Sequence, residues 1–320
     1  MNILGLKNKN LGEHKIAVTS KTFSNNKCLV SELQKYFDDV KINKYNDELA
    51  NDTLTEFLKD CDGMILGTEK LDEKVIRSLS YMKYISKYGA GLSNVDFEAL
   101  RRHNIKILYK KGVNSDSVAE LVLGFVLDLI RRMDESVQSY RKGKWGKLPG
   151  KELSEITLGI IGYGHIGKVV AKKFAALGVR KLLINDFLEF SRETFCEFVS
   201  HEYLLAESDV VTIHIDAENR NYNFIDDTFI NNMKSGAYLI NTSRGSVVDE
   251  EALIKALKIG KIGGAALDVY KDEPEINKKL ANCPNLLTTC HIAGSSNRAI
   301  NIMGKAAIEG LLRLFNSDSV

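Results

Sequence analysis

Short apolar runs alternate with amphipathic stretches over the first 115 residues of the chain. The apolar runs have the length of buried strands and cover residues 16–19, 40–42, 63–67, 84–88 and 105–109. Between them, apolar residues recur at helical spacing over residues 30–37 and 54–59. This alternation predicts a parallel sheet with helices on both faces.

A second series of the same kind follows later in the chain. We predict strands at residues 158–161, 181–185, 210–213, 237–241, 263–267 and 286–289, and a last helix over residues 297–315. Between the two series, helical spacing begins at Ser115 and continues toward Arg141, which predicts one long helix. Either Ser115 or Asp116 could cap its start. This helix is the natural crossover between two domains.

A glycine-rich turn joins the first strand of the second series to a helical stretch at residues 169–177. Its three glycines, Gly162, Gly164 and Gly167, have the G-x-G-x-x-G spacing of a dinucleotide-binding turn. The next strand ends at Asp186, whose carboxylate could accept both ribose hydroxyls and would repel a 2′-phosphate. The motif therefore favours NAD over NADP. The alternative is a tight turn and a surface aspartate in an ordinary α/β protein.

Composition limits the classes of partner and compartment. The 320 residues are enough for two domains, and 44 Lys and Arg balance 42 Asp and Glu, so we expect no nucleic-acid partner. The five cysteines are scattered without a C-x-x-C pair, which favours a reducing compartment over a disulfide scaffold or zinc site. No apolar run has the length of a signal peptide or membrane span. We expect a cytoplasmic protein with no membrane partner and no metal.

Three charged or titratable side chains follow the ends of predicted strands late in the chain. Arg244 can hold a carboxylate with two parallel hydrogen bonds, and Glu273 and His291 follow the next two strands. In a parallel sheet these strand ends share the edge where ligands bind. A carboxylate beside an imidazole raises the pKa of the imidazole, which suits a proton donor near neutral pH. Taken singly, each residue could instead be structural: a helix-capping arginine, a solvated loop acid and a buried histidine.

With these residues in this order, the chain resembles the D-isomer-specific 2-hydroxyacid dehydrogenase family, and its phosphoglycerate-dehydrogenase-like members above all. Five segments carry the resemblance: KYGAGLSNVD at 87–96, SVAELVLG at 117–124, GIIGYGHIG at 159–167, NTSRG with VVDEEAL at 241–253, and LDVYKDEP with HIAG at 267–294. It extends over nearly the whole chain.

The resemblance implies roles for individual residues. Arg244 would bind the substrate carboxylate and polarise the reacting carbonyl, His291 would be the general acid and base, and Glu273 would orient His291. The substrate carboxylate would also meet backbone N–H groups of Gly89, Ala90 and Gly91. Cofactor contacts would come from Gly162, Gly164, His165, Ile166, Gly167, Asp186, Thr242, Ser243, Arg244, Asp268 and His291.

The resemblance also implies the architecture: two Rossmann-like or flavodoxin-like parallel-sheet α/β domains separated by a cleft. Residues 116–292 would form the NAD-binding Rossmann domain, and residues 1–115 with 293–320 the substrate domain. The protein would be a homodimer built through the cofactor domain. The expected reaction is hydride transfer between NAD and a D-2-hydroxy acid or its 2-oxo form, with 3-phosphoglycerate a candidate substrate. Glyoxylate or hydroxypyruvate reduction, D-lactate oxidation and an NAD-sensing regulatory or interaction role are the alternatives.

Two positions depart from the family pattern. Many relatives have proline where Asp216 stands, in a loop expected near the nicotinamide, so the details of cofactor contact are open there. Relatives often have proline before the catalytic histidine, whereas this chain has Cys290, which we interpret as a packing residue.

Overall fold

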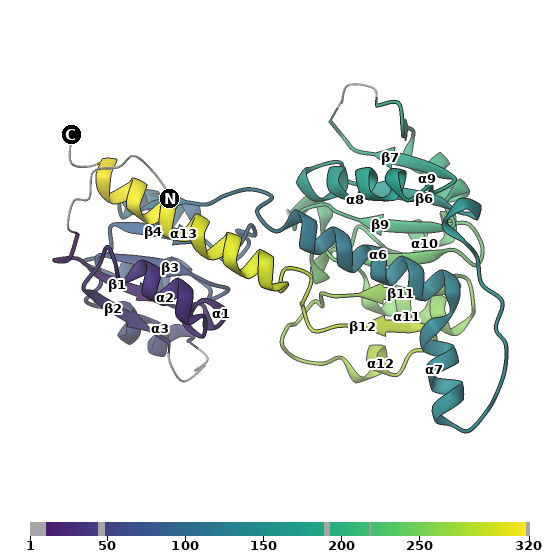
Figure 1. Ribbon diagram of the computed structural model, residues 1–320, viewed down its shortest axis with the longest axis horizontal. Helices are drawn as coiled ribbons and strands as arrows, with labels where there is room; N and C mark the ends of the chain where they lie inside the picture. Colours follow the sequence, from purple (N-terminus) through teal and green to yellow (C-terminus); the bar gives the residue numbers. More distant parts are fainter. Residues whose placement is uncertain (1–10, 44–48, 189–192, 218, 318–320) are drawn as a thin grey trace. The chain divides into compact units, whose positions relative to one another are not determined.

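The chain divides into two compact units, each built on its own parallel sheet (Figure 1). The computed structural model describes residues 11–43, 49–188, 193–217 and 219–317. Unit 1 consists of Met1–Asn114 and Ser295–Val320, and unit 2 of Ser115–Gly294. From the sequence we expected these divisions after residues 115 and 292. Both units are α/β, as predicted.

Unit 1 contains a five-stranded parallel sheet in the order β2-β1-β3-β4-β5. The strands are β1 (Lys15–Val18), β2 (Asp39–Ile42), β3 (Gly63–Leu66), β4 (Tyr84–Lys87) and β5 (Lys106–Leu108). The helices are α1 (Lys21–Ser24), α2 (Lys27–Leu33), α3 (Asn51–Leu58), α4 (Glu73–Arg77), α5 (Phe97–Arg102) and the C-terminal α13 (Asn297–Ser317). Apolar side chains of α2 and α13 pack on one face of the sheet and those of α3, α4 and α5 on the other.

Unit 2 contains a seven-stranded parallel sheet in the order β12-β11-β10-β9-β6-β7-β8. The strands are β6 (Thr157–Ile161), β7 (Lys181–Asn185), β8 (Glu197–Phe198), β9 (Val210–Ile213), β10 (Tyr238–Asn241), β11 (Gly264–Leu267) and β12 (Leu286–Thr288). The chain winds outward from β6 in both directions, so the order switches between β6 and β9. Such switch points are where ligands bind in open α/β sheets.

Helices cover both faces of the second sheet (Figure 1). The α-helices are α6 (Ser115–Arg131), α7 (Met133–Arg141), α8 (His165–Ala176), α9 (His201–Glu207), α10 (Asp227–Asn232), α11 (Glu250–Lys258) and α12 (Lys278–Ala281). Short 3₁₀ turns are η1 (Leu153–Glu155), η2 (Asn219–Asn221) and η3 (Gly245–Val247). The apolar sides of α6 and α8 form one core with the sheet, and those of α9, α10 and α11 form the other.

The prediction of one helix from Ser115 toward Arg141 is wrong. Helix α6 ends at Arg131, Arg132 takes a left-handed conformation with φ of 53°, and α7 begins at Met133. The Ile130 carbonyl accepts a hydrogen bond from the Lys151 amide at 2.9 Å, so the returning chain binds the end of α6. Capping by Ser115 is also wrong, because this residue lies inside the helix and its buried hydroxyl has no hydrogen-bond partner among the described residues.

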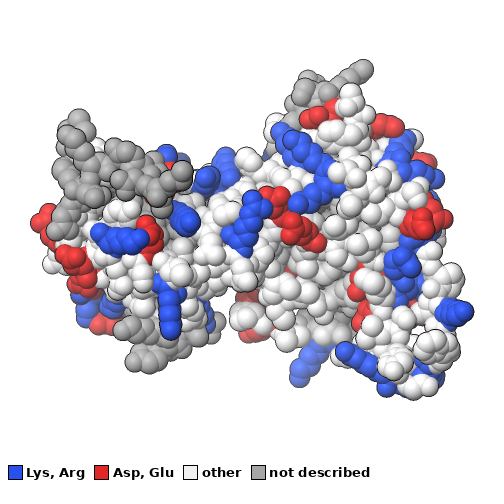
Figure 2. Space-filling model, viewed as in Figure 1, with Lys and Arg blue, Asp and Glu red and all other residues white. Residues whose placement is uncertain are grey.

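Charged side chains of both signs are interspersed on the surface shown in Figure 2, in keeping with the balanced composition. Within the described ranges, none of the helices combines the length and the apolar character that crossing a bilayer would require.

Candidate active site

Three adjacent strands of unit 2 carry the predicted catalytic residues just beyond their carboxyl ends. Arg244 follows β10, Glu273 follows β11 and His291 follows β12, and these strands are neighbours in the parallel sheet. The sheet order therefore brings together residues that are up to 47 positions apart in the sequence.

His291 and Glu273 form a direct pair. The imidazole Nδ1 lies 2.7 Å from the Glu273 Oε2, and the other carboxylate oxygen accepts a 2.6 Å hydrogen bond from the Tyr270 amide. This second bond holds the carboxylate in place, which in turn orients the ring and leaves Nε2 for chemistry. The side chain of His291 is 48% exposed and that of Glu273 is 31% exposed, so the pair is reachable from solvent.

Each partner shifts the pKa of the other toward the charged form. The hydrogen bond to Glu273 raises the pKa of His291, against the effect of burial, and the charges of Glu273 and Asp268 raise it further. Burial by itself would raise the pKa of Glu273, but the bonds from His291 and Tyr270 outweigh it, so the net pKa is lowered. The imidazolium is thus favoured beside an ionised carboxylate.

Arg244 lies on a loop that is held in shape by hydrogen bonds to the Asn241 side chain. The Asn241 Oδ1 accepts hydrogen bonds from the Ser243 amide and hydroxyl, at 2.9 and 2.7 Å, and its Nδ2 donates to the Arg244 carbonyl at 2.9 Å. Gly245 lets this loop approach the one after β11, because a Cβ there would lie 1.9 Å from the Tyr270 carbonyl carbon. Burial lowers the pKa of the Arg244 guanidinium, and the nearby Glu273 carboxylate opposes that shift.

Asp268 has a positioning role in this structure. Its buried carboxylate accepts hydrogen bonds from the Thr289 hydroxyl at 2.6 Å and from the amides of Ile292 and Ala293, both at 2.8 Å. These bonds hold the chain on both sides of His291, which has a left-handed φ of 51°. A non-glycine residue in that region carries strain that its surroundings must offset. The expected contact of Asp268 with the cofactor stays a prediction.

The glycine-rich turn has the shape that a dinucleotide needs. Gly162 has a φ of 93°, and a Cβ on Gly167 would lie 2.0 Å from the Gly162 carbonyl oxygen, so the turn packs α8 tightly against β6. At Gly164, by contrast, a Cβ would meet no other described atom within 4 Å, which leaves room for a diphosphate near the start of α8. His165 and Ile166 form the first turn of that helix.

Asp186 and Thr242 also fit a cofactor site. Asp186 follows β7. Its carboxylate accepts hydrogen bonds from the Tyr163 amide at 2.6 Å and from the Leu188 amide at 2.9 Å, and these bonds hold the carboxylate beside the glycine turn. Thr242 is buried, and its hydroxyl has no hydrogen-bond partner among the described residues, as expected of a group that binds a ligand. With the open space at Gly164, these observations fit NAD.

Two residues that sequence reasoning missed belong to the same edge. Asn241 is a buried polar residue at the end of an apolar strand, a signal that could have drawn attention to it. His214 directly follows β9, its Nε2 lies 3.0 Å from the Thr212 hydroxyl, and burial lowers its pKa to about 3. Its imidazole is therefore neutral, and its buried Nδ1 has no hydrogen-bond partner within the described part of the chain.

The remaining predicted positions are placed as follows. Gly89, Ala90 and Gly91 follow β4 in unit 1, and Gly89 has a φ of 106°. Asp216 accepts a 2.7 Å hydrogen bond from Asn221 in the loop after β9. Cys290 is exposed, so its interpretation as a packing residue is wrong. In the described ranges, no group of three or more His, Cys, Asp or Glu side chains is placed to hold a metal ion.

Known proteins are similar to this chain in both sequence and fold. Residues 123–293 match the family described as D-isomer specific 2-hydroxyacid dehydrogenase, NAD binding domain. A glyoxylate reductase from Thermofilum pendens is 35% identical over 280 residues, covering 84% of this chain and 83% of the relative. The chain belongs to the D-isomer-specific 2-hydroxyacid dehydrogenases. It is an NAD-dependent oxidoreductase of that family.

Two further relatives agree with this assignment. A hydroxypyruvate reductase from Thermotoga maritima is 33% identical over 274 residues, covering 84% of this chain and 89% of the relative. The crystal structure of a D-lactate dehydrogenase with NAD⁺ from Lactobacillus jensenii has a TM-score of 0.78 and 28% identity, and the match covers 95% of this chain and 97% of the other.

Proposed function

We propose that the enzyme reduces a short 2-oxo acid, glyoxylate or hydroxypyruvate, to the corresponding 2-hydroxy acid. The observation that carries the proposal is the His291–Glu273 pair at 2.7 Å, with the Arg244 guanidinium close enough for its charge to act on both partners. The choice of substrate is supported by relatives named glyoxylate reductase and hydroxypyruvate reductase.

His291 acts as the general acid in this direction. Its protonated ring donates a proton to the carbonyl oxygen of the 2-oxo acid. When bound, NADH would supply the hydride that the carbonyl carbon accepts. Glu273 keeps the ring charged until the proton is needed, because it raises the pKa of His291. In the oxidative direction the neutral imidazole takes the hydroxyl proton back.

Arg244 binds the substrate carboxylate and stabilises the negative charge that develops on the carbonyl oxygen. The planar guanidinium can make two parallel hydrogen bonds to a carboxylate, which a lysine cannot reproduce. Its partial burial strengthens these contacts, because charge interactions are weaker in water. We assign the backbone N–H groups of Gly89, Ala90 and Gly91 to the same carboxylate.

The cofactor lies along the carboxyl edge of the second sheet in this proposal. Gly162, Gly164, His165, Ile166 and Gly167 would hold the diphosphate. Asp186 would bind the adenosine ribose, and the loop of Thr242, Ser243 and Arg244 would face the nicotinamide side. Thr242 supports this placement best, because its hydroxyl is buried without a partner among the described residues.

The decisive experiment is a substrate panel followed by the oxidation of NADH at 340 nm. It contains glyoxylate, hydroxypyruvate, pyruvate and 3-phosphohydroxypyruvate, with wild-type enzyme, Arg244→Met and His291→Gln. The control is Arg101→Met, which removes an exposed arginine that pairs with Glu98 on α5. We expect glyoxylate or hydroxypyruvate to give the highest kcat/KM, and the first two variants to lose at least about 100-fold. A preference for 3-phosphohydroxypyruvate would overturn the substrate assignment, and NADH binding without turnover of any acid would favour an NAD-sensing role.

We also propose a homodimer in a reducing, cytoplasmic compartment. Helix α7, all of whose residues are described, buries none of its side chains, and Met133, Val137 and Tyr140 on it are exposed. Trp145, a few residues further on, is 85% exposed. An apolar surface of this kind is typical of a subunit interface. The five cysteines, all free, fit the compartment.

A further inference from the structure

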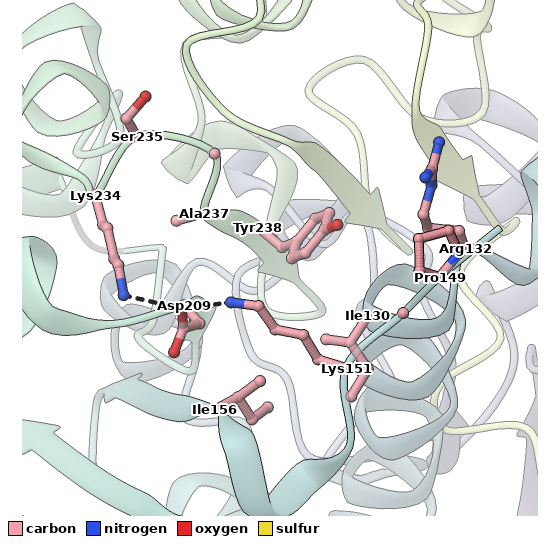
Figure 3. Close-up of a pocket in the computed structure, with 12 residues that line it drawn as sticks. Ile130, Arg132, Pro149, Lys151, Ile156, Asp209, Lys234, Ser235, Ala237 and Tyr238 are labelled. Carbon is pink, nitrogen blue, oxygen red and sulfur yellow. Dashed lines mark hydrogen bonds and ion pairs between the residues drawn. The ribbon is translucent and has the colours of Figure 1, made fainter.

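A group of charged side chains lies beside a cavity at the opposite edge of the unit 2 sheet from Arg244 and His291. Here a cavity of about 360 Å³ opens at the amino ends of β6, β9 and β10. Its size is near the lower end of the range for small-molecule sites, about 300–1,000 Å³. We call it the Asp209 cavity, after the acidic residue among those that line it (Figure 3).

Cations converge on Asp209. The ammonium groups of Lys151 and Lys234 approach it from two sides, and each nitrogen lies 3.0 Å from the Oδ1 atom (Figure 3). The Arg180 guanidinium lies 3.8 Å from Oδ2, which also accepts the Thr157 amide at 2.9 Å. One carboxylate thus faces three cations. Two of them, Lys151 and Lys234, line the cavity, so its lining keeps one positive charge that Asp209 does not compensate.

The two lysines are open to a ligand, whereas the carboxylate is not. The Asp209 side chain is 8% exposed, but those of Lys151 and Lys234 are 53% and 44% exposed. Because both ammonium groups contact the same oxygen, Asp209 sets their spacing before any ligand arrives. Arg132 also lines the cavity, but Glu135 neutralises it through hydrogen bonds of 2.8 Å.

Much of the rest of the cavity wall is apolar, although Ser235 also lines it. Ile130, Ile156, Ala237 and the ring of Tyr238 face the same space as the lysines (Figure 3). A ligand with a compact anionic group and an organic body matches this lining. A phosphate monoester is such a ligand, with a charge of about −1.5 to −2 at pH 7, and lysine binds phosphate as a point charge.

We propose that the Asp209 cavity binds the phosphate group of a small molecule between the ammonium groups of Lys151 and Lys234. The site is separate from the catalytic residues, which lie at the other end of the strands, and the proposal does not depend on the substrate. It also lies where α7 leaves and returns to the domain, since Ile130 and Lys151 are joined there by a 2.9 Å backbone hydrogen bond. A bound phosphate would therefore reinforce the base of α7.

The test is isothermal titration calorimetry with inorganic phosphate and with phenyl phosphate, at constant ionic strength set with chloride. We expect saturable binding with a Kd of about 1 mM or tighter, as two charge-assisted hydrogen bonds support. Lys151→Gln and Lys234→Gln should each weaken binding at least about tenfold. Lys234→Arg, which keeps the positive charge, should still bind phosphate. Tighter binding of phenyl phosphate would identify an organic ester as the ligand, and equal binding would identify free phosphate.

Two variants serve as controls. Lys255→Gln removes a lysine that pairs with Asp227 elsewhere in unit 2, and should bind phosphate like the wild type. Arg244→Met removes the catalytic anion contact and should also bind normally. Absence of saturable binding would overturn the proposal, as would binding that survives both lysine variants or disappears in Arg244→Met. Melting temperatures with and without phosphate provide an independent readout, since only variants that bind should be stabilised.

Discussion

Replacing Asp268 tests how the fold holds His291 in its strained conformation. In Asp268→Ala the amides of Ile292 and Ala293 lose their acceptor inside the protein. A buried, unsatisfied donor costs about 1–3 kcal/mol, so the loss at the buried Ala293 amide should lower the free energy of unfolding by about 1–3 kcal/mol. The Ile292 amide is only partly buried and adds less. The Thr289 hydroxyl is only partly buried and also adds less. Asp268→Asn keeps one acceptor oxygen, so it should lower the free energy of unfolding by about half as much.

Urea unfolding, followed by circular dichroism, measures the stability of both variants, and steady-state kinetics and NADH titration measure their function. If Asp268 positions His291, Asp268→Asn should lower kcat for the 2-oxo acid at least about tenfold while the Kd for NADH stays within about twofold. A large rise in the Kd for NADH would instead assign Asp268 to the cofactor. An unfolding free energy within about 0.5 kcal/mol of wild type would refute the reasoning, since that is the usual effect of a surface change.

Three further changes test the cofactor site and the proposed dimer. Asp186→Ser removes a charge that repels a 2′-phosphate, so the ratio of kcat/KM for NADPH to that for NADH should rise at least about tenfold, and an unchanged ratio would refute this role. Gly167→Ala places a Cβ against the Gly162 carbonyl, so calorimetry should show weaker NADH binding and urea unfolding a loss of about 1–3 kcal/mol. Trp145→Ser and Tyr140→Ser should shift the protein toward monomer in analytical ultracentrifugation, whereas an unchanged mass would exclude α7 from the interface.

The sequence predicts best what is decided locally. The strands predicted at 181–185 and 210–213 coincide with β7 and β9, because a short apolar run of this length is typical of a buried strand. The glycine spacing predicts the turn after β6 because a side chain at Gly162 or Gly167 would clash there, while Gly164 leaves open space. The order of Arg244, Glu273 and His291 after successive strands was enough to predict their meeting, since parallel strands share a carboxyl edge.

What the sequence does not reveal depends on contacts between distant segments. The end of α6 is set by Lys151, twenty residues after Arg131, so helical periodicity could not locate it. Asp268 looks like a loop acid until the fold buries it against Ile292 and Ala293. The convergence of Lys151 and Lys234 on Asp209 likewise joins three loops that share no sequence motif.

The pH dependence of catalysis tests the central pair most directly. Reduction needs protonated His291, so kcat/KM for the 2-oxo acid should fall as pH rises through the pKa of this residue, which the bond to Glu273 raises. In Glu273→Gln the carboxylate no longer raises the pKa of His291, while burial continues to lower it. The fall in kcat/KM should therefore occur at lower pH. Glu275→Gln, a change of the same charge two residues away, should keep the wild-type profile. A profile that stays in place in Glu273→Gln, or moves to higher pH, would contradict the account.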